Sequence, residues 1–481
     1  MAVRSSAIFK GCAALSVLII VLHGVTLWAA PFASLYPTAP AMLILVAFLA
    51  IFLLCARLVI ARSAGSARDV PASPNLMDQA FGDRRLRAFL LLVSLAGIAL
   101  HVWSKYYLIE LRPISCISEI RFAWLEVDRS LLPVHIRMAS ILGHLLTSFA
   151  YLGMLAISYT MGRSGSVRAV CRSDIALQLF FTLVGSLYAG FIGSRNAMLA
   201  FLAMNLVGLM LGLEAPEGGK KPVRRWRLAL VTLAMPLIGM VAFSSAIFSD
   251  RLTCHEPDAL VKFQGHGLSA GKIAAYHMTG NYREFALKAL TQDDGAEWRE
   301  TLFVERCPVC GPALVYANHG VFNLSKVLAS DERGPAILLS YIAAWGKRIG
   351  LNIRSDGENG VRVYGPGGIT LAGAAYHDYG VLGVVLVAAV LGLLFGQSIN
   401  WMASSGSRVI VGAWLFSVLF YVLIISSIFV GFSILPFPFI TFGIGVGLMV
   451  WMLFFSGLRS KRRRSSVRPN SSSLHDIDYR S

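Results

Sequence analysis

The stretch AMLILVAFLAIFLLCARLVI, residues 41–60, decides the fold, because Arg57 is its only charged residue. A helix needs about 20 mostly apolar residues to cross a hydrocarbon layer roughly 30 Å thick. Only a helix or a closed barrel satisfies every backbone polar group inside lipid. Residues 41–60 therefore predict a membrane-spanning helix.

Similar stretches occur along the whole chain, so we predict an all-α polytopic membrane protein with about ten spans. The first stretch follows Arg4 and Lys10 as a cleavable signal peptide does, but its 20 apolar residues favour a retained span. The predicted spans are residues 11–30, 41–60, 88–103, 138–160, 175–193, 197–213, 228–248, 369–396, 409–430 and 433–456.

The composition supports a membrane protein and excludes other classes. Of the 481 residues, 56% are hydrophobic and only 14% are charged, whereas roughly 25% are charged in an ordinary soluble domain. A soluble, disordered, collagen-like or disulfide-scaffold protein is therefore excluded, because a water-soluble core of this size cannot hide so much apolar surface.

The net charge of +17 indicates orientation rather than nucleic-acid binding. With both termini in the cytoplasm, the cytoplasmic segments hold 24 Lys and Arg but 8 Asp and Glu, and the outer segments hold 19 and 17. This asymmetry follows the positive-inside rule. The run Lys461–Arg464 is typical of a stop-transfer segment that contacts anionic lipids.

We expect four parts along the chain: an N-terminal bundle of seven spans (1–248), a large periplasmic loop with short helices (249–368), a C-terminal bundle of three spans (369–456) and a basic, disordered tail (457–481). The large loop holds 13 basic and 13 acidic residues. Loops that long are usually functional.

The cysteines and histidines of the outer segments give no metal signature, so we predict no bound metal and no cofactor. The outer segments hold four cysteines, Cys116, Cys254, Cys307 and Cys310. Four cysteines allow two disulfides, with three possible pairings. The alternative is a metal or redox site at Cys307 and Cys310. The histidines of the large loop lack the spacing of a zinc site.

Ionisable residues at membrane depth are costly, so each is a functional candidate. Arg195, in the short outer hairpin 193–196, suits bidentate phosphate binding; the alternative is an arginine that snorkels to the interface. Three further arginines, Arg333, Arg348 and Arg362, precede the span 369–396. One interpretation is that they bind a lipid diphosphate or a charged glycan. Ordinary surface pairing is the alternative for these three.

His377 and Asp378 lie inside the span 369–396. A buried histidine beside a carboxylate is able to take a proton from a hydroxyl nucleophile, and the alternative is a polar cluster that holds helices together. Neighbours on a helix point about 100° apart, so the two need not act as a pair. We expect only helix packing from the nearby glycines, Gly380, Gly383, Gly392 and Gly396.

Three histidines, His23, His101 and His144, stand isolated on their spans, where core hydrogen bonding is the expected role. The chain has no Walker loop and no GxGxxG on a strand, and its GxSxG pattern at Gly267–Gly271 does not follow a predicted strand as a nucleophile elbow does. Nucleotide-driven transport and cytoplasmic nucleotide-sugar chemistry lose support accordingly.

The segment Tyr376-His377-Asp378-Tyr379-Gly380-Val381-Leu382-Gly383 resembles the span after the large periplasmic loop of Wzy-type O-antigen or oligosaccharide repeat-unit polymerases. In that family this span opens with an aromatic, an amide or acid, an aromatic and Gly-x-x-Gly. The hairpin around Arg195 is similar to the outward-facing arginine of these enzymes. Family members often carry a Glu shortly before the aromatic, where this chain has Ala374 and Ala375.

The resemblance implies a metal-independent glycosyltransferase of the bacterial inner membrane, which moves a growing glycan from undecaprenyl diphosphate onto an incoming lipid-linked repeat unit. His377 is then the expected base, with Asp378 orienting it, and Tyr376 lies at the substrate. Arg195 and Arg362 stabilise the leaving diphosphate, with Arg333 and Arg348 in reserve. The expected partners are the lipid-linked glycan, membrane lipids and a chain-length regulator, and not nucleic acid.

Three other functions stay open. An O-antigen ligase shares the lipid donor but transfers the glycan to lipid A core. A polysaccharide or lipid transporter or flippase predicts paired broken helices and polar residues at mid-bilayer in both halves. An acyltransferase or a membrane structural protein should tolerate Arg195→Lys.

Overall fold

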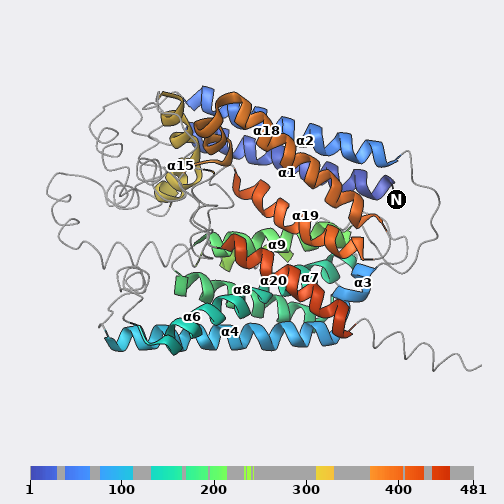
Figure 1. Cartoon of the computed structure of the whole chain (residues 1–481), viewed down its shortest axis with the longest axis vertical. Coiled ribbons are helices and arrows are strands. Elements are labelled where there is room, and N and C mark those ends of the chain that lie inside the picture. Colours follow the sequence, from blue (N-terminus) through green and yellow to red (C-terminus); the bar gives the residue numbers. More distant parts are fainter. Residues whose placement is uncertain are drawn as a thin grey trace, which may run out of the picture.

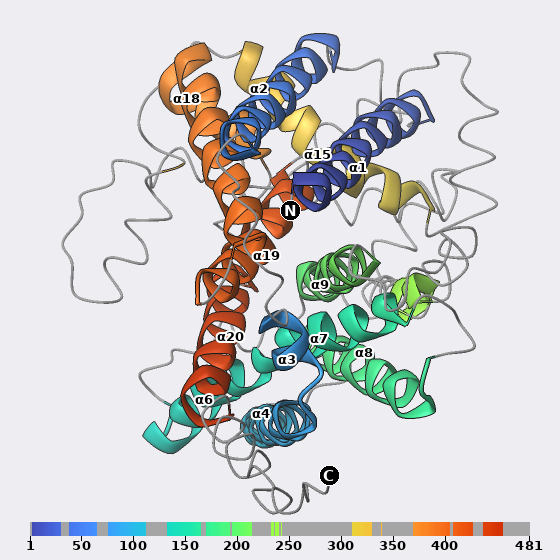
Figure 2. The same cartoon turned by 90° about the vertical axis from the view of Figure 1, so that its right-hand side faces the viewer.

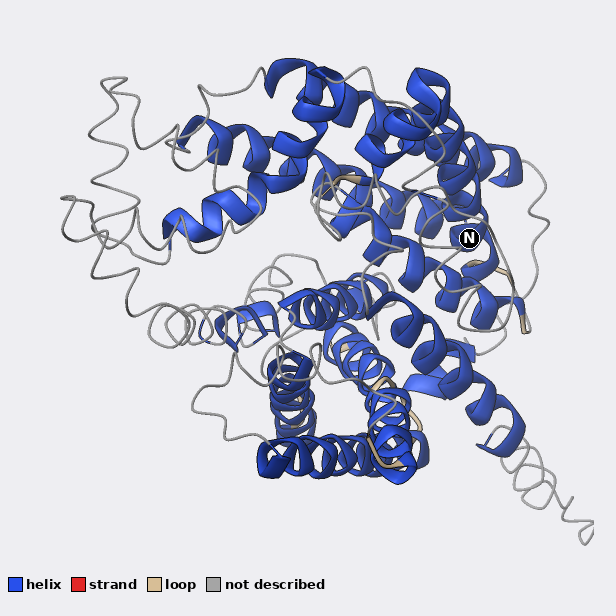
Figure 3. Ribbon diagram, turned by 60° about the vertical axis from the view of Figure 1, so that its left-hand side comes forward, coloured by secondary structure: helices blue, strands red, loops and turns tan. Residues whose placement is uncertain are grey.

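The chain is helical throughout the part that the computed structural model describes, with no strand in that part (Figure 3). The described residues are 2–29, 38–64, 76–111, 132–164, 170–192, 195–213, 232–234, 236–239, 242, 310–329, 338, 369–404, 407–426 and 436–455. The predicted all-α class is therefore confirmed. The helices are α1 (Ala2–Ala29), α2 (Thr38–Ala64), α3 (Leu76–Phe81), α4 (Arg84–Leu111), α6 (Val134–Thr147), α7 (Phe149–Arg163), α8 (Arg172–Ile192), α9 (Arg195–Leu213), α15 (Cys310–Ala329), α18 (Leu371–Met402), α19 (Arg408–Ser426), α20 (Pro436–Val450) and the π-helical η8 (Trp451–Phe455).

Seven segments of the described part are long and apolar enough to cross a membrane. They coincide with the first four and the last three predicted spans. Helices α8 and α9 cover the predicted spans 175–193 and 197–213. Most of 228–248 lies outside the described residues. A polytopic membrane protein is thus supported, and the count of ten spans stays a prediction.

The outward faces of the helices carry large apolar side chains. Leu43 on α2 is 69% exposed, Leu92 on α4 65% and Leu382 on α18 65%. Exposed apolar surface of this extent is costly in water. Lipid is the solvent that these faces suit.

The helices form two groups that α19 joins (Figures 1 and 2). One group holds α1, α2, α15 and α18; the other holds α4, α6, α7, α8 and α9. Helix α19 contacts α18 on one side and α9 and α20 on the other. Gly392 and Gly396 of α18 lie against the carbonyl oxygens of Phe52 and Ala56 on α2, where a Cβ would come within 2.3 and 2.6 Å. The packing role predicted for these two glycines is confirmed.

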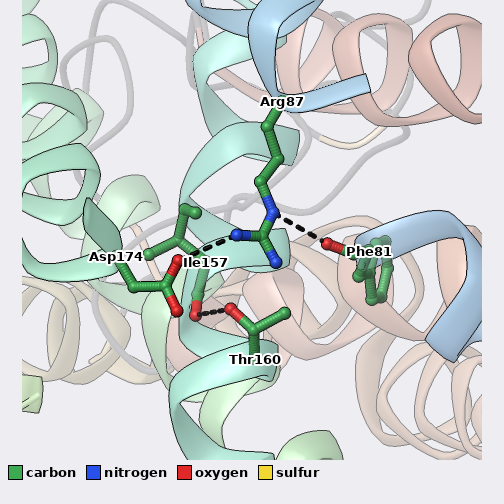
Figure 4. A network of polar contacts seen from close by, with 5 residues as sticks. All are labelled: Phe81, Arg87, Ile157, Thr160 and Asp174. Atoms are coloured by element: carbon green, nitrogen blue, oxygen red, sulfur yellow. Dashed lines mark hydrogen bonds and ion pairs between the residues drawn. The ribbon is translucent and has the colours of Figure 1, made fainter. Parts of the chain in front are cut away.

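One end of the second group is closed by the short helix α3 and by ion pairs. Arg87 Nη1 lies 2.8 Å from Asp174 Oδ1 on α8, and its Nε donates a hydrogen bond to the Phe81 carbonyl (Figure 4). Arg163, the last residue of α7, pairs with Asp78 on α3. The start of α1 lies at the same end of the molecule as α3, and α15 lies at the opposite end (Figure 1).

Two parts of the predicted large loop are described: helix α15 and residue 338. Helix α15 packs against α1, α2 and α18. Thr26 Oγ1 on α1 donates a hydrogen bond of 3.0 Å to Oδ1 of Asn318, whose side chain is fully buried. This part of the predicted loop therefore belongs to the first helix group. The rest of the loop and the tail lie outside the described residues, so the four-part division stays a prediction.

Candidate functional site

Helix α18 is broken at Gly380, near its beginning. Gly380 has φ 61° and ψ −151°, a backbone conformation that is essentially restricted to glycine. The leading segment, residues 371–379, starts with a cap in which the Thr370 hydroxyl accepts a hydrogen bond of 2.9 Å from the Gly373 amide. The leading segment is thus fixed at its start by a cap and at its end by a glycine.

The break turns the leading segment back toward the rest of α18. A Cβ on Gly383 would lie only 2.3 Å from the carbonyl oxygen of Ala375. Residues eight apart in a straight helix are about 12 Å apart, so the chain bends sharply between them. The expectation that all four glycines serve only helix packing is therefore wrong for Gly380, which makes the bend possible.

His377 and Asp378 form a buried pair in the leading segment. His377 Nδ1 lies 3.0 Å from Asp378 Oδ1, and their side chains are 5% and 0% exposed. Neighbouring side chains in a regular helix point about 100° apart and need not meet. In this structure the side chains of His377 and Asp378 do meet. When the carboxylate is ionised it only accepts hydrogen bonds, so Nδ1 then carries the hydrogen and Nε2 is the ring nitrogen left to accept a proton.

The second carboxylate oxygen of Asp378 is hydrogen-bonded to a backbone amide of the predicted large loop. Oδ2 accepts a hydrogen bond of 2.7 Å from the amide of Leu338, a residue that packs against the hydrophobic core. Asp378 therefore connects His377 to a segment 40 residues earlier in the chain. Sequence reasoning missed Leu338, because a backbone amide leaves no trace in the residue type.

The aromatic residues that flank the pair point in different directions. Tyr376 is partly buried and packs against the core, whereas Tyr379 is 49% exposed. The predicted place of Tyr376 at the substrate stays a prediction.

The other predicted site residues lie at or beyond the edge of the described part. Arg195 is the first residue of α9, but its side chain lies outside the described residues. Arg333, Arg348 and Arg362 lie outside it entirely. Their positions relative to His377 stay predictions.

The predicted disulfides and the predicted absence of a metal also stay predictions. Cys116, Cys254 and Cys307 lie outside the described residues, and Cys310 begins α15 with its side chain outside them. The remaining cysteines, Cys12, Cys55 and Cys171, are free thiols. The described residues contain no group of three or more histidine, cysteine or acidic side chains that could hold a metal ion.

Two of the histidines considered isolated lie in contact with each other. The rings of His101 on α4 and His144 on α6 meet edge to face with centroids 4.5 Å apart, so two spans meet at these rings. His144 Nδ1 lies 2.9 Å from the Tyr188 hydroxyl, and His23 Nδ1 lies 3.5 Å from Asn318 Oδ1. Core hydrogen bonding, the role predicted for them, is confirmed for His23 and His144.

Comparisons with protein-family models, with curated proteins and with solved structures give no match for this chain. Its function is therefore inferred from its own residues.

Proposed function

We propose that this chain is a metal-independent glycosyltransferase that polymerises undecaprenyl-diphosphate-linked oligosaccharide repeat units on the periplasmic face of the bacterial inner membrane. The product is O-antigen, capsule or exopolysaccharide. The observation that carries the proposal is the buried, hydrogen-bonded pair of His377 and Asp378 beside the break in α18. Its motif, Tyr376 to Gly383, is also where the chain resembles repeat-unit polymerases.

The pair suits general base catalysis of glycosyl transfer. A hydroxyl of the acceptor sugar attacks the anomeric carbon of the donor, and the bond from that carbon to the diphosphate oxygen breaks. The proton of the hydroxyl moves to His377 Nε2, and undecaprenyl diphosphate leaves. Asp378 holds the ring through Nδ1–H and stabilises the imidazolium that forms.

The surroundings of the pair suit a donor that water would destroy. The imidazole is 5% exposed and the carboxylate is fully buried. The amide of Leu338 occupies the second carboxylate oxygen and ties the loop segment to the pair. Exclusion of water prevents hydrolysis of an activated donor and strengthens the electrostatic interactions in the site.

Arginines stabilise the leaving group in this proposal. The charge on the diphosphate grows as the glycosidic bond breaks, and fixed guanidinium groups bind phosphate oxygens in pairs. Arg195 and Arg362 take this role, with Arg333 and Arg348 in reserve. Tyr376 supplies an aromatic surface for the substrate. A chain-length regulator and membrane lipids complete the proposed partners.

The proposal is tested by gel analysis of surface polysaccharide in a strain that carries variants in place of the natural gene. We expect His377→Ala and Arg195→Ala to abolish chain extension and leave one repeat unit on the lipid core. His135, exposed at the start of α6, provides the control His135→Ala, which should give a normal ladder. Protein level is followed by immunoblot.

The other outcomes of the gel distinguish the rival functions. A bare core with no repeat unit would indicate the ligase reaction. A normal ladder from His377→Ala at normal protein level would contradict the assigned base, and a normal ladder from Arg195→Ala would contradict the diphosphate role of Arg195.

A further inference from the structure

The starts of α4 and α8 are held together at one end of the second helix group. Arg87 on α4 and Asp174 on α8 form an ion pair of 2.8 Å, and their side chains are only 18% and 12% exposed. The Arg87 Nε–H also donates a hydrogen bond to the Phe81 carbonyl oxygen, so the guanidinium is fixed on two sides (Figure 4). This pair therefore sets the distance between the residues that come just before it on the two helices.

Three exposed arginines lie beside this ion pair. Arg84 and Arg85 are the first two residues of α4, and Arg172 is the first residue of α8. Each comes two or three positions before the paired residue of its own helix, a rise of roughly 3–5 Å along the axis. The ion pair thus brings three positively charged side chains to one small area of the surface, which we call the arginine cluster.

The described part of the chain offers the arginine cluster no counter-charge. The three guanidinium groups form no ion pair and no hydrogen bond with any residue of that part. The acidic residues closest to them in the sequence are already occupied. Asp174 is paired with Arg87, and Asp83 accepts hydrogen bonds from the Arg85 backbone amide and the Trp451 indole N–H. A ligand that neutralises the cluster therefore has to carry the negative charge itself.

Apolar surface continues from the cluster along both helices. Leu92 lies seven residues after Arg85 on α4, and Leu179 lies seven residues after Arg172 on α8. Residues seven apart lie on the same face of a helix, about 10 Å apart along its axis. The two leucines are 65% and 48% exposed, and Leu183 continues the apolar face of α8 at 58%. Each helix therefore presents a positive charge at its start and exposed hydrocarbon further along the same face.

This combination selects a membrane lipid with a net negative charge. A guanidinium binds two phosphate oxygens at once, and arginines at the cytoplasmic ends of spans attract anionic lipid headgroups. A soluble phosphate or a nucleic acid would use the arginines and leave the leucines without a partner. A zwitterionic lipid would bring a second cation to three arginines that already lack a counter-charge. An anionic phospholipid uses both the charged and the apolar part of the surface.

We propose that Arg84, Arg85 and Arg172 bind the headgroup of an anionic phospholipid, whose acyl chains lie along the exposed leucines of α4 and α8. The lipid then joins the two helix starts from the outside, as the ion pair of Arg87 joins them from the inside. The site lies at the end of the bundle that holds α3, which the charge asymmetry assigns to the cytoplasm (Figure 1). His377 belongs to the other helix group, so the site does not depend on the proposed reaction.

Lipid-dependent thermal stability of the full-length protein tests the proposal. The purified protein in detergent is titrated with phosphatidylglycerol, with phosphatidylcholine of the same acyl chains, or with soluble glycerol phosphate. We expect phosphatidylglycerol alone to raise the Tm, because only it supplies both the negative charge and the acyl chains. Changing Arg84, Arg85 and Arg172 together to Gln should weaken the apparent affinity roughly 100-fold, about five-fold for each arginine. An equal rise in Tm with phosphatidylcholine or glycerol phosphate would overturn the proposal.

A matched variant separates the site from the general positive charge of this end. Arg57 and Arg62 on α2 and Arg408 on α19 are also exposed, and changing these three to Gln removes the same charge. The matched variant should keep the wild-type affinity for phosphatidylglycerol. An equal loss in both triple variants would mean that net charge alone attracts the lipid. Either that result or an unchanged affinity in the cluster variant would contradict the site.

Photocrosslinking tests the site in a chain that keeps all its arginines. p-Benzoylphenylalanine replaces Leu92 in one variant and Leu54 on α2, which is 58% exposed, in the control. From an equimolar mixture of phosphatidylglycerol and phosphatidylcholine, position 92 should capture several-fold more phosphatidylglycerol than position 54. The same ratio of the two lipids at both positions would overturn the proposal, even where the Gln variants fail to fold.

Discussion

Asp378 binds a different group with each of its carboxylate oxygens. Oδ1 faces His377 Nδ1 at 3.0 Å, and Oδ2 accepts from the Leu338 amide at 2.7 Å. The residue therefore orients the ring and anchors a distant segment at the same time. A side chain with one carbonyl oxygen cannot accept both hydrogen bonds with equal geometry.

Asp378→Asn is accordingly expected to slow glycosyl transfer without unfolding the chain. We expect a fall in kcat of up to about 10⁴-fold, as for the aspartate that orients the base histidine of a Ser-His-Asp triad. The rate is measured with purified protein and lipid-linked repeat units. Asp174→Asn is the control, because it breaks the ion pair with Arg87 at the opposite end of the molecule and should lower the Tm rather than kcat. An unchanged kcat for Asp378→Asn would rule out the orienting role.

Sequence reasoning found His377 and Asp378 but not how they are connected. Both stood out because ionisable residues are rare at membrane depth. Their mutual hydrogen bond was not predictable from helix geometry, which separates neighbours by about 100°. The contact with Leu338 depends on tertiary structure, because any residue type supplies the same backbone amide.

At the scale of elements, the bend in α18 positions the pair. Only glycine readily adopts the backbone conformation of Gly380, and Gly383 lies against the Ala375 carbonyl on the far side of the bend. The motif with two glycines three residues apart was visible in the sequence, but its role as a bend was not. The periodicity and hydropathy of the apolar run 369–396 fit one straight helix as well as they fit a bent one.

Gly380→Ala is expected to destabilise the protein and to reduce activity together. Forcing a Cβ into this conformation costs about 1–3 kcal/mol, and relief of that strain would straighten α18 and move the leading segment. Thermal unfolding and polymerisation are measured on the same preparation. Gly24→Ala in α1 is the control, since a Cβ there meets nothing within 4 Å. Equal Tm and activity for Gly380→Ala and wild type would refute the bend.

Elements with long apolar runs were predictable, and elements that depend on packing were not. Helices α1, α2, α4, α18 and α19 coincide with uninterrupted apolar stretches. Helix α3 has only six residues, with Met77, Ala80 and Phe81 buried by neighbouring helices. Helix α15 carries Asn318 and Asn323 on buried positions, which tertiary contacts satisfy rather than a hydropathy pattern.

At the scale of the whole molecule, the charge asymmetry predicts which end of the bundle faces the cytoplasm. The ion pairs of Arg87 and Arg163 lie at the end that holds α3 and the start of α1, the end that the positive-inside rule assigns to the cytoplasm. The broken start of α18 and helix α15 lie at the other end (Figure 1). The proposed reaction requires that other end to face the periplasm.

Thiol labelling checks this orientation. Cys171, an exposed free thiol just before α8, should react with a membrane-impermeant maleimide in inside-out vesicles and stay unlabelled in spheroplasts. The measurement uses a variant in which the other cysteines are replaced by serine. Val134→Cys, at a position 64% exposed at the start of α6, serves as the control with the opposite pattern in a chain without Cys171. Labelling of Cys171 in spheroplasts would reverse the topology.

The most direct measurement is the turnover of purified protein in liposomes with synthetic undecaprenyl-diphosphate-linked repeat units and EDTA. The account predicts glycan longer than one repeat unit, released undecaprenyl diphosphate, and a rate that falls about 10²- to 10⁴-fold in His377→Gln. Donor binding should be unchanged in this variant. A wild-type rate in His377→Gln, or loss of all turnover with EDTA, would contradict the account.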